Sequence, residues 1–401
     1  MELTDVVKAK KRLSGVIHNI PLEHSARFSE ISGGNVFLKC EHRQLTGSFK
    51  VRGAYNKTAV LKERGGVERV IAASAGNHAQ GVAFAARENG IKATIVMPRS
   101  TPIVKVSATE GYGAEVLLYG NCYDDAHQKA LEIQDETGAE FIEAFDDDDV
   151  IAGQGTLGLE ILNELEDVDV IVVPAGGGGL LAGVAKTIKS LKPGVRVIGV
   201  QAAKADAIRR SFDEKRLLSL DNIYTIADGI AVKKPGGRTF GIIRDFADEV
   251  VTVTDEEIAS TIIDLIERTK QVVEPAGAAG LAAVLHGKTE LKGLNVACVL
   301  SGGNIDVGFV HKIIEKGLIQ RGRELHLSIL VNDAPGNLAK ISGIMGEAYA
   351  NITSVRYDRA VAEIHLNEVI LHITCEVSGK EHGERLIRRL SDAGFKLLQP
   401  K

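Results

Sequence analysis

Short runs rich in Val and Ile, separated by longer stretches with helical periodicity, constrain the fold of this chain more than any other feature of its sequence. The runs are apolar at nearly every position rather than at alternate positions. Strands of this kind are buried on both faces, which is typical of parallel sheets covered by helices. We therefore expect an α/β protein, with strands over residues 70–73, 93–97, 116–119, 169–173, 195–201 and 295–300.

Local signals mark helices between these strands. Residues 77–88 carry a helical pattern directly after the first strand, and a second helix is expected from about Leu180, after a run of glycines. Thr254 and Glu257 form a capping box, which predicts a helix over 258–268.

The pattern changes near residue 320. Beyond a basic stretch that contains glycine, the order becomes βαββαβ within about 80 residues, the order of a ferredoxin-like unit. A chain of 401 residues is too long for one ordinary hydrophobic core, so we expect a separate C-terminal domain. Its expected elements are strand 325–331, helix 337–349, strands 352–359 and 368–377, helix 380–393 and strand 395–399.

Composition and charge exclude several classes of function. The net charge of -5 gives no reason to expect nucleic acid as a partner. The four cysteines are scattered without a CxxC pair, which argues against a disulfide framework and a thiolate zinc site. The sequence has no N-terminal signal pattern and no apolar stretch of the roughly 18–20 residues that span a bilayer, so we expect a cytoplasmic protein with no membrane partner. The acidic run Asp146–Asp149 is expected to be a solvated loop, and no metal site is expected.

Lys50 is the first candidate for chemistry. It lies in the run Ser48–Ala54, directly after Phe49 and three residues before Gly53. A lone lysine is most often solvated. A lysine that forms a Schiff base must be able to lose its proton, however, and partial burial lowers the pKa of an amine. The aromatic neighbour of Lys50 suits such a role.

A second candidate is the run Ala73–Gly81, between an expected strand and an expected helix. Ser74 is a natural N-cap, and the free N–H groups of a helix N-terminus favour an anion such as a substrate carboxylate. A simple capped turn would explain Ser74 but not Asn77 and His78 beside it. His78 by itself is better explained as a structural histidine than as a catalytic base.

Four consecutive glycines, Gly176–Gly179, follow the expected strand at 169–173 and precede a helix. Such a loop lets backbone N–H groups surround a phosphate at the helix N-terminus. A dinucleotide-binding fold would need an acidic residue at the end of the next strand, where this chain has Gln201. An ATP-binding loop would need Gly-Lys-Ser/Thr, whereas Gly183 is followed by Val184. The pattern therefore favours a phosphate site for a ligand other than NAD or ATP.

Ser301 follows the last expected strand of this series, in the turn Ser301–Asn304. Ligands of open α/β sheets bind at the carboxyl ends of strands, so the hydroxyl of Ser301 is placed to contact a bound ring. Taken alone, the turn would carry little information.

Together and in this order, the four runs resemble those of the fold-type II enzymes that use pyridoxal 5'-phosphate (PLP). Among these they are most similar to the threonine dehydratases that carry one C-terminal ACT domain, over nearly the whole chain. The resemblance implies a fold like that of the tryptophan synthase β subunit, with two open, twisted, mostly parallel sheets. It implies a catalytic domain over 1–320, with a smaller subdomain at about 46–148 inserted in it, and an ACT domain over 321–401.

The resemblance also implies the site. Lys50 would hold PLP as a Schiff base and remove the Cα proton of the substrate, with Glu274 and the Gly229 segment near the ring. Asn77 would bond the 3'-hydroxyl of the cofactor. The residues implied to contact the cofactor are Lys50, Phe49, Asn77, Gly176, Gly177, Gly178, Gly179, Leu180 and Ser301, and those implied to receive the substrate carboxylate are Ser74, Ala75, Gly76 and Asn77.

The implied reaction is the β-elimination of L-threonine to 2-oxobutanoate and ammonia, and also of L-serine to pyruvate. Ser301 would bond the ring nitrogen of the cofactor. A hydroxyl there, unlike a carboxylate, would not stabilise a protonated ring, which favours prompt elimination over transamination.

Other readings of the same fold stay open. A serine racemase would have a serine in place of Ala75, and acidic cation ligands in place of Gln201 and Ala207. Threonine synthase and relatives of cystathionine β-synthase fit the glycine loop and the ACT domain less well. A sensor that no longer catalyses would have no need of an intact Lys50.

The C-terminal domain implies a partner of its own. The turn at 332–338 resembles the turn with which ACT domains bind amino acids, so an effector such as isoleucine or valine is expected there. A purely structural or oligomerising role is the alternative, and a homo-oligomer, either a dimer or a tetramer, is expected. The implied effector residues are Asn332, Asp333, Gly336, Asn337 and Leu338.

Overall fold

The computed structural model describes residues 1–359 and 364–398, and the chain divides into two compact units, Met1–Ile305 and Asp306–Lys401. The sequence pattern predicts a boundary after residue 320. The second unit instead begins before helix α13 (Val307–Gln320), because α13 contacts the strand that follows it. Within the described ranges, no helix is both long enough and apolar enough to span a bilayer.

Six strands form the main sheet of the first unit, in the order β1-β2-β10-β7-β8-β9. Neighbouring strands are parallel except for β1 and β2, which are antiparallel. This confirms the mostly parallel sheet that the apolar runs predict. The strands are β1 (Leu22–His24), β2 (Asn35–Lys39), β7 (Val170–Pro174), β8 (Arg196–Ala202), β9 (Glu249–Val253) and β10 (Asn295–Val299).

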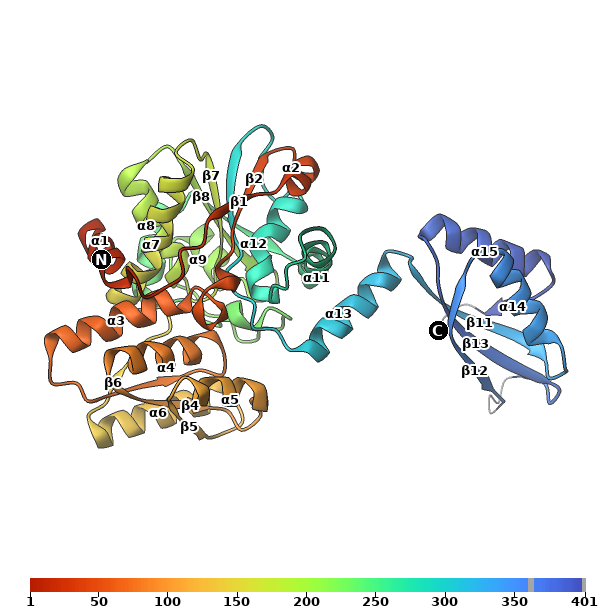
Figure 1. The fold of residues 1–401 in the computed structure, drawn as a ribbon, viewed down its shortest axis with the longest axis horizontal. Helices are drawn as coiled ribbons and strands as arrows, with labels where there is room; N and C mark the ends of the chain where they lie inside the picture. The colour runs from red at the N-terminus through yellow and green to blue at the C-terminus, as the bar shows by residue number, and fades with distance from the viewer. Residues whose placement is uncertain (360–363, 399–401) are drawn as a thin grey trace. The chain divides into compact units, whose positions relative to one another are not determined.

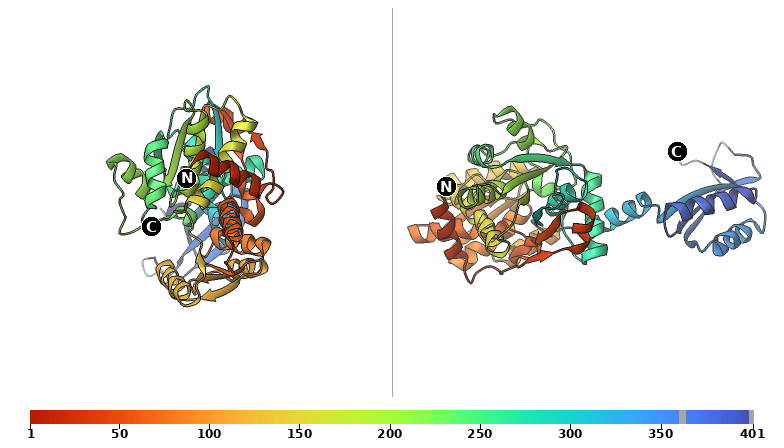
Figure 2. Two further views of the ribbon diagram at one scale, coloured as in Figure 1. Left: turned by 90° about the vertical axis from the view of Figure 1, so that its left-hand side faces the viewer. Right: turned by 90° about the horizontal axis from the view of Figure 1, so that it is seen from above.

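Helices cover both faces of the main sheet, which is why its Val and Ile side chains are buried throughout. In Figure 1, α7 and α8 lie on one side of the sheet, and α11 and α12 on the other. Helix α1 packs against α7, close to the N-terminus in both views of Figure 2. The helices are α1 (Leu3–Leu13), α2 (Ala26–Ser32), α7 (Asp148–Glu164), α8 (Gly179–Leu191), α9 (Ala207–Glu214), α10 (Gly237–Phe246), α11 (Asp255–Asp264) and α12 (Pro275–Leu285).

The capping box that opens α11 is present, with Thr254 Oγ1 accepting the N–H of Glu257 at 3.2 Å. Helix α11 then continues as a single π-helical turn, Leu265–Thr269, which the sequence pattern does not predict. That turn ends at Lys270, whose φ of 60° lies in the left-handed region. The chain therefore changes direction just before Glu274, at the start of α12.

The first unit contains a second, smaller sheet of four parallel strands, in the order β5-β4-β3-β6. It is built from consecutive segments, with helices packed on both of its faces. The strands are β3 (Arg69–Ala73), β4 (Lys92–Met97), β5 (Glu115–Leu118) and β6 (Glu140–Phe141), and the helices are α3 (Lys50–Arg64), α4 (Asn77–Asn89), α5 (Ile103–Gly111) and α6 (Tyr123–Thr137).

Two glycines allow close packing between α3, which covers the small sheet, and α7, which covers the main sheet. Helices α3 and α7 cross at Gly53 and Gly153, where a Cβ on Gly153 would lie 2.5 Å from the carbonyl oxygen of Arg52. Only glycine permits this approach. The first turn of α3, which begins at Lys50, is thereby held against α7.

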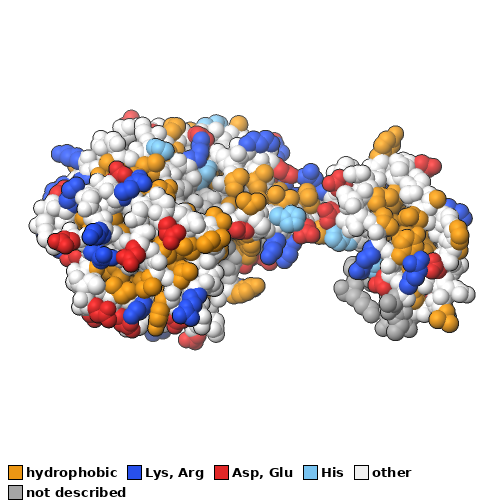
Figure 3. Space-filling model, turned by 60° about the horizontal axis from the view of Figure 1, so that its bottom comes forward, with side chains coloured by type: hydrophobic (Ala, Val, Ile, Leu, Met, Phe, Trp, Pro, Cys, Tyr) orange, Lys and Arg blue, Asp and Glu red, His pale blue; other side chains and the backbone are white. Residues whose placement is uncertain are grey.

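The acidic run Asp146–Asp149 is not the solvated loop that its composition predicts. Asp147 is the N-cap of α7, and its carboxylate accepts the N–H of Val150 at 3.1 Å. The carboxylate of Asp146 accepts backbone N–H groups from the first turn of α10, among them that of Thr239 at 3.0 Å. On the face shown in Figure 3, acidic and basic side chains of the first unit are interspersed.

The second unit has the ferredoxin-like order that the sequence predicts. Its antiparallel sheet has the order β12-β13-β11-β14, and α14 and α15 pack on one face over a core that includes Ile329, Leu371 and Leu386. The elements are β11 (Glu324–Asn332), α14 (Asn337–Glu347), β12 (Asn351–Asp358), β13 (Glu368–Glu376), α15 (Lys380–Asp392) and β14 (Lys396–Leu398).

Candidate active site

A cavity of about 690 Å³ lies in the first unit, between the carboxyl ends of the strands of its two sheets. Ala73 ends β3, Pro174 ends β7, and Ser301 follows β10, and all three line the cavity. The structure thus brings together the four runs that the sequence singles out. The predicted residues that line it are Phe49, Lys50, Ser74, Ala75, Gly76, Asn77, Gly176, Gly177, Gly178, Gly179, Leu180 and Ser301.

Lys50 is the first residue of α3, and its ammonium group donates to the carbonyl oxygen of Ala144 at 2.8 Å. The Nζ atom also lies 5.4 Å from the centroid of the Phe49 ring. Burial lowers the pKa of Lys50 to about 8, and the nearby Glu274 opposes this shift. The amine can therefore lose its proton close to neutral pH, as a Schiff-base lysine requires.

Asn77 is the first residue of α4, and both polar atoms of its side-chain amide are hydrogen bonded. Its Nδ2 donates to Glu274 Oε1 at 2.7 Å, and its Oδ1 accepts from Asn304 Nδ2 at 2.6 Å. Burial raises the pKa of Glu274 to about 7, and the charge of Asp228 adds to the shift. Asn304 is a contact that the sequence analysis did not assign. Its place in a turn after a buried strand was the one signal available.

The turn before α4 corrects one prediction. Ser74 is not the N-cap, because α4 begins at Asn77 and its N-cap is Gly76, which has no side chain. The Ser74 hydroxyl instead accepts the N–H of Gly76 at 3.2 Å. No side chain caps the N-terminus of α4, so its first N–H groups are available to an anion in the cavity.

His78 has a structural environment, as the sequence predicts. Its side chain is buried, and Nε2 lies 2.9 Å from the carbonyl oxygen of Ile142. Burial, followed by the charge of Lys50, lowers the pKa of His78 to about 3. A base that stays neutral across the working pH range and already bonds a backbone carbonyl has little capacity for proton transfer.

The four glycines form a loop from the end of β7 to the start of α8. Gly178 has a φ of 100°, and a Cβ on Gly177 would lie 2.3 Å from the Phe145 ring. Thr239 fixes the loop from the other side, with Oγ1 donating to the carbonyl oxygen of Gly177 at 2.7 Å. No side chain caps α8, so the loop combines tight backbone packing with a helix N-terminus that suits a phosphate.

Arg52, two residues after Lys50, is the largest feature that the sequence reasoning missed. Its guanidinium is fully buried and donates to Glu41, Glu160 and Thr156 at 2.5–3.1 Å. The five N–H donors of the guanidinium are all used. A second buried cation, Lys39, also reaches Glu160, at 3.0 Å. The network ties β2, α3 and α7 together.

The positions that would distinguish a racemase are also resolved. Ala75 lines the cavity, so the position offers a methyl group where a racemase relative would have a hydroxyl. Gln201 is buried at the end of β8, and its Oε1 accepts the N–H of Arg209 at 2.9 Å. Its amide oxygen is thus already used within the fold.

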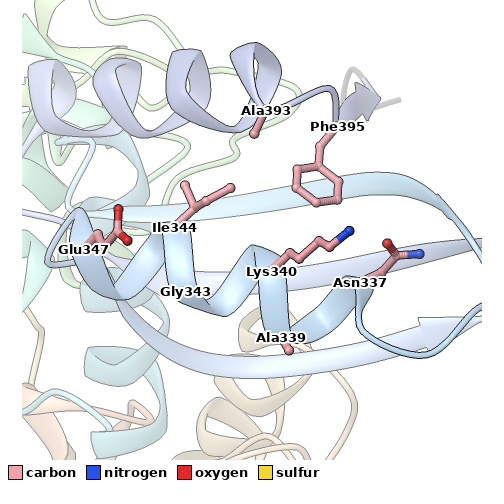
Figure 4. Close-up of a pocket in the computed structure, with 8 residues that line it drawn as sticks. All are labelled: Asn337, Ala339, Lys340, Gly343, Ile344, Glu347, Ala393 and Phe395. Atoms are coloured by element: carbon pink, nitrogen blue, oxygen red, sulfur yellow. The ribbon is translucent and has the colours of Figure 1, made fainter.

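A second hollow, of about 490 Å³, lies in the C-terminal unit along α14 (Figure 4). Of the five residues predicted to bind an effector, only Asn337 lines it. The Asp333 carboxylate pairs with Arg359 at 2.8 Å, and Leu338 packs against the core. Asn337 itself donates to the carbonyl oxygen of Asn332 at 2.8 Å. The structure therefore does not bring the five residues into one hollow.

The cavity of the first unit fits PLP. Its amine of lowered pKa, its glycine loop at a helix N-terminus, its amide and its serine hydroxyl match the aldehyde, phosphate, 3'-oxygen and ring nitrogen of that cofactor. The close packing of Gly177 on Phe145 leaves the loop no room for a side chain, as a backbone cradle requires.

Known proteins point the same way. A family model described as pyridoxal-phosphate dependent enzyme matches residues 13–302. A protein of Thermotoga maritima named L-threonine ammonia-lyase is 47% identical over 395 residues, which cover 98% of each chain. The solved structure of a threonine deaminase from Solanum lycopersicum has a TM-score of 0.75 at 38% identity, over 78% of this chain and 86% of that one. A maize serine racemase gives a TM-score of 0.75 at 33% identity, over 80% and 98%.

Proposed function

This chain belongs to the family of pyridoxal-phosphate-dependent enzymes, and from that premise we propose that it is an L-threonine ammonia-lyase, which converts L-threonine to 2-oxobutanoate and ammonia. One observation carries the proposal. Lys50, Asn77, the glycine loop and Ser301 share a single cavity, in a chain that is 47% identical over nearly its full length to a protein of that name.

Each part of the cofactor has residues to hold it. The glycines at 176–179 and Leu180 would take the phosphate, Ser301 the ring nitrogen, Asn77 the 3'-oxygen and Phe49 a ring face. When bound, PLP supplies an electron sink for the charge that develops at Cα. Ser301 can offer the ring nitrogen only a neutral hydroxyl, which favours elimination over transamination.

Lys50 is the residue that moves a proton. When it is not bonded to the cofactor, its Nζ would be the base that takes the proton from Cα of the substrate. A pKa of about 8 leaves a usable fraction of the amine unprotonated near neutral pH. The carbonyl of Ala144, 2.8 Å from Nζ, keeps the amine on one side of the cavity.

The start of α4 binds the substrate carboxylate in this proposal. The residues of the Ser74–Asn77 turn line the cavity, and the N-terminus of α4, which has no side-chain cap, adds partial positive charge. Loss of the β-hydroxyl as water, followed by tautomerisation and hydrolysis, gives the keto acid and ammonia in balance. L-serine would follow the same course to pyruvate.

Serine racemase is the alternative with the same cavity. Racemisation needs a group that returns a proton to the opposite face of Cα, and Ala75 has none to give. We therefore propose elimination as the main reaction and at most a minor yield of D-serine from L-serine.

We also propose a regulatory role for the C-terminal unit, with an amino acid such as isoleucine or valine bound near the Asn332–Leu338 turn, and a homo-oligomeric enzyme. The ferredoxin-like order of that unit and its separate core support a domain with a function of its own. Because Asp333 is paired with Arg359 and Asn337 donates to the carbonyl oxygen of Asn332, binding there would require one of these two contacts to rearrange. Calorimetric titration of the whole protein with each amino acid tests this; no heat from any of them would contradict it.

The catalytic proposal is tested with the wild-type protein and two lysine variants on α3. We expect 2-oxobutanoate from L-threonine with the wild type and with Lys62→Ala, whose lysine is exposed. We expect neither product nor visible cofactor absorbance with Lys50→Ala. Full turnover by Lys50→Ala would overturn the assignment.

A further inference from the structure

Three side chains from distant segments form a continuous hydrogen-bonded chain beside the cavity. Asn304 Nδ2 donates to the carbonyl oxygen of Thr46 at 2.8 Å and to Asn77 Oδ1 at 2.6 Å. Asn77 Nδ2 in turn donates to Glu274 Oε1 at 2.7 Å. The chain thus runs from the turn before Lys50 to the start of α12.

The two ends of this chain determine the orientation of both amides. The carbonyl of Thr46 can only accept, so the Asn304 atom that faces it must be nitrogen. That nitrogen donates one N–H to Thr46 and the other to Asn77. The Asn77 atom that accepts the second N–H must therefore be oxygen. The other Asn77 atom is nitrogen, and it faces Glu274, whose carboxylate can accept it. A flipped Asn77 amide would set N–H against N–H and oxygen against a carboxylate.

Two glycines leave the space that the side chains of this hydrogen-bonded series occupy. A Cβ on Gly47 would lie 2.4 Å from Asn304 Oδ1, and a Cβ on Gly302 would lie 2.3 Å from Glu274 Oε1. Thr46 adopts a φ of 63°, which is strained for a β-branched residue. Thr46 is also the residue whose carbonyl oxygen accepts from Asn304. The strained backbone conformation therefore occurs at the hydrogen bond itself.

We propose that Asn304 and Glu274 are positioning residues, which hold the Asn77 amide so that its remaining N–H is presented to the ligand in the cavity. The inference rests on the proposed function, because the acceptor for that N–H is the 3'-oxygen of PLP. Neither residue touches the reacting carbon; both act through Asn77. A donor at the 3'-oxygen stabilises its deprotonated form.

The visible spectrum of the holoenzyme reports the protonation state of the 3'-oxygen directly. The deprotonated 3'-oxygen goes with visible absorbance, and the protonated one with absorbance in the near ultraviolet. We expect Asn304→Ala, which frees Asn77 to turn its oxygen inward, to lower the ratio of visible to near-ultraviolet absorbance by roughly tenfold, as expected for the loss of one hydrogen bond to a charged group. Glu274→Ala is expected to act in the same direction.

The decisive comparison uses the Asn77→Ala background. If Asn304 acts through Asn77, then Asn304→Ala changes the ratio in the wild type and not in Asn77→Ala. An equal change in both backgrounds, or none in the wild type, would overturn the inference. A purely structural role would lower the melting temperature and the cofactor content, but would leave the ratio in the bound fraction unchanged.

Asn295→Ala is the matched control, because Asn295 lies at the opposite end of β10 and its amide is also hydrogen bonded, to Asn35 and Asp167. We expect its ratio to equal that of the wild type. Asn304→Ser retains one donor and should give an intermediate ratio if the alanine variant does not fold; a ratio equal to that of the wild type would also overturn the inference. A wild-type protein with no borohydride-sensitive visible band would contradict the proposed function instead.

Discussion

Arg52 and Glu41 form a two-point ion pair in the interior of the first unit, with Nε–Oε2 and Nη2–Oε1 distances both of 2.8 Å. Both side chains are 0% exposed. The pair joins the first turn of α3, which carries Lys50, to the segment that follows β2. The position of the Lys50 amine therefore depends on a buried charge network rather than on apolar packing alone.

Breaking this pair should destabilise the protein strongly. Arg52→Met leaves the buried Glu41 carboxylate without its partner, and we expect a loss of about 3–5 kcal/mol in the free energy of unfolding. Arg216→Met breaks the Arg216–Glu214 pair, in which both side chains are largely exposed, and should cost about 1 kcal/mol or less. Urea unfolding of both variants measures the difference. Equal losses would show that the buried network contributes no more than a surface pair.

The rate at which PLP attaches to the cofactor-free protein should rise with pH around a midpoint of about 8, because only the neutral Lys50 amine attacks the aldehyde and burial lowers its pKa to that value. A free lysine derivative should show its midpoint roughly two units higher. Stopped-flow measurement of visible absorbance across pH 6–11 follows the reaction. A protein midpoint equal to that of the free amine would contradict the burial of Lys50.

Glu274 should make the cofactor-free protein less stable as the pH rises. The pKa of this carboxyl is about 7 in the folded chain, against an ordinary pKa of 4.5 for a solvated glutamate. Below pH 4.5 both states carry the proton and the group contributes no difference; the folded state then loses stability up to about pH 7. Glu274→Gln, which keeps an acceptor for Asn77, should therefore stabilise the protein at pH 8 by up to about 3 kcal/mol and not at pH 4.

Thermal unfolding of cofactor-free Glu274→Gln and wild type at several pH values tests this expectation. Glu110→Gln, an exposed position, is the matched control and should give the same difference at every pH. A Glu274→Gln difference that does not change between pH 4 and pH 8 would show that the carboxyl is not buried in the folded protein.

Gly177 should not tolerate a side chain. A Cβ there would lie 2.3 Å from the Phe145 ring, so Gly177→Ala must displace the glycine loop, to which we assign the cofactor phosphate. We expect the affinity for PLP to fall at least about tenfold, the effect of losing one charge-assisted hydrogen bond. Gly194→Ala is the control, because nothing lies within 4 Å of its Cβ position. Fluorescence titration with PLP compares the two, and equal affinities would argue against the cradle.

The structure also separates what local patterns could predict from what they could not. Buried strands were predictable because an apolar run reports its burial at every position. The helix start at residue 77 was predicted, but its cap was not, since Ser74 could bond either the helix or its own turn. The boundary at Ile305 was missed because α13 has a helical pattern that is compatible with either unit.

The sequence by itself determined the order of strands and helices, the candidate Schiff-base lysine, the glycine loop and the serine that follows β10, because each is a pattern of residues that are adjacent along the chain. Only the tertiary structure decided how those pieces work together. Asn304, Glu274 and Thr46 are up to 258 residues apart, and Arg52 reaches Glu160 across 108. Their hydrogen bonds exist because two sheets and their helices meet at one cavity, and no local pattern records which distant polar groups a close-packed interior will pair.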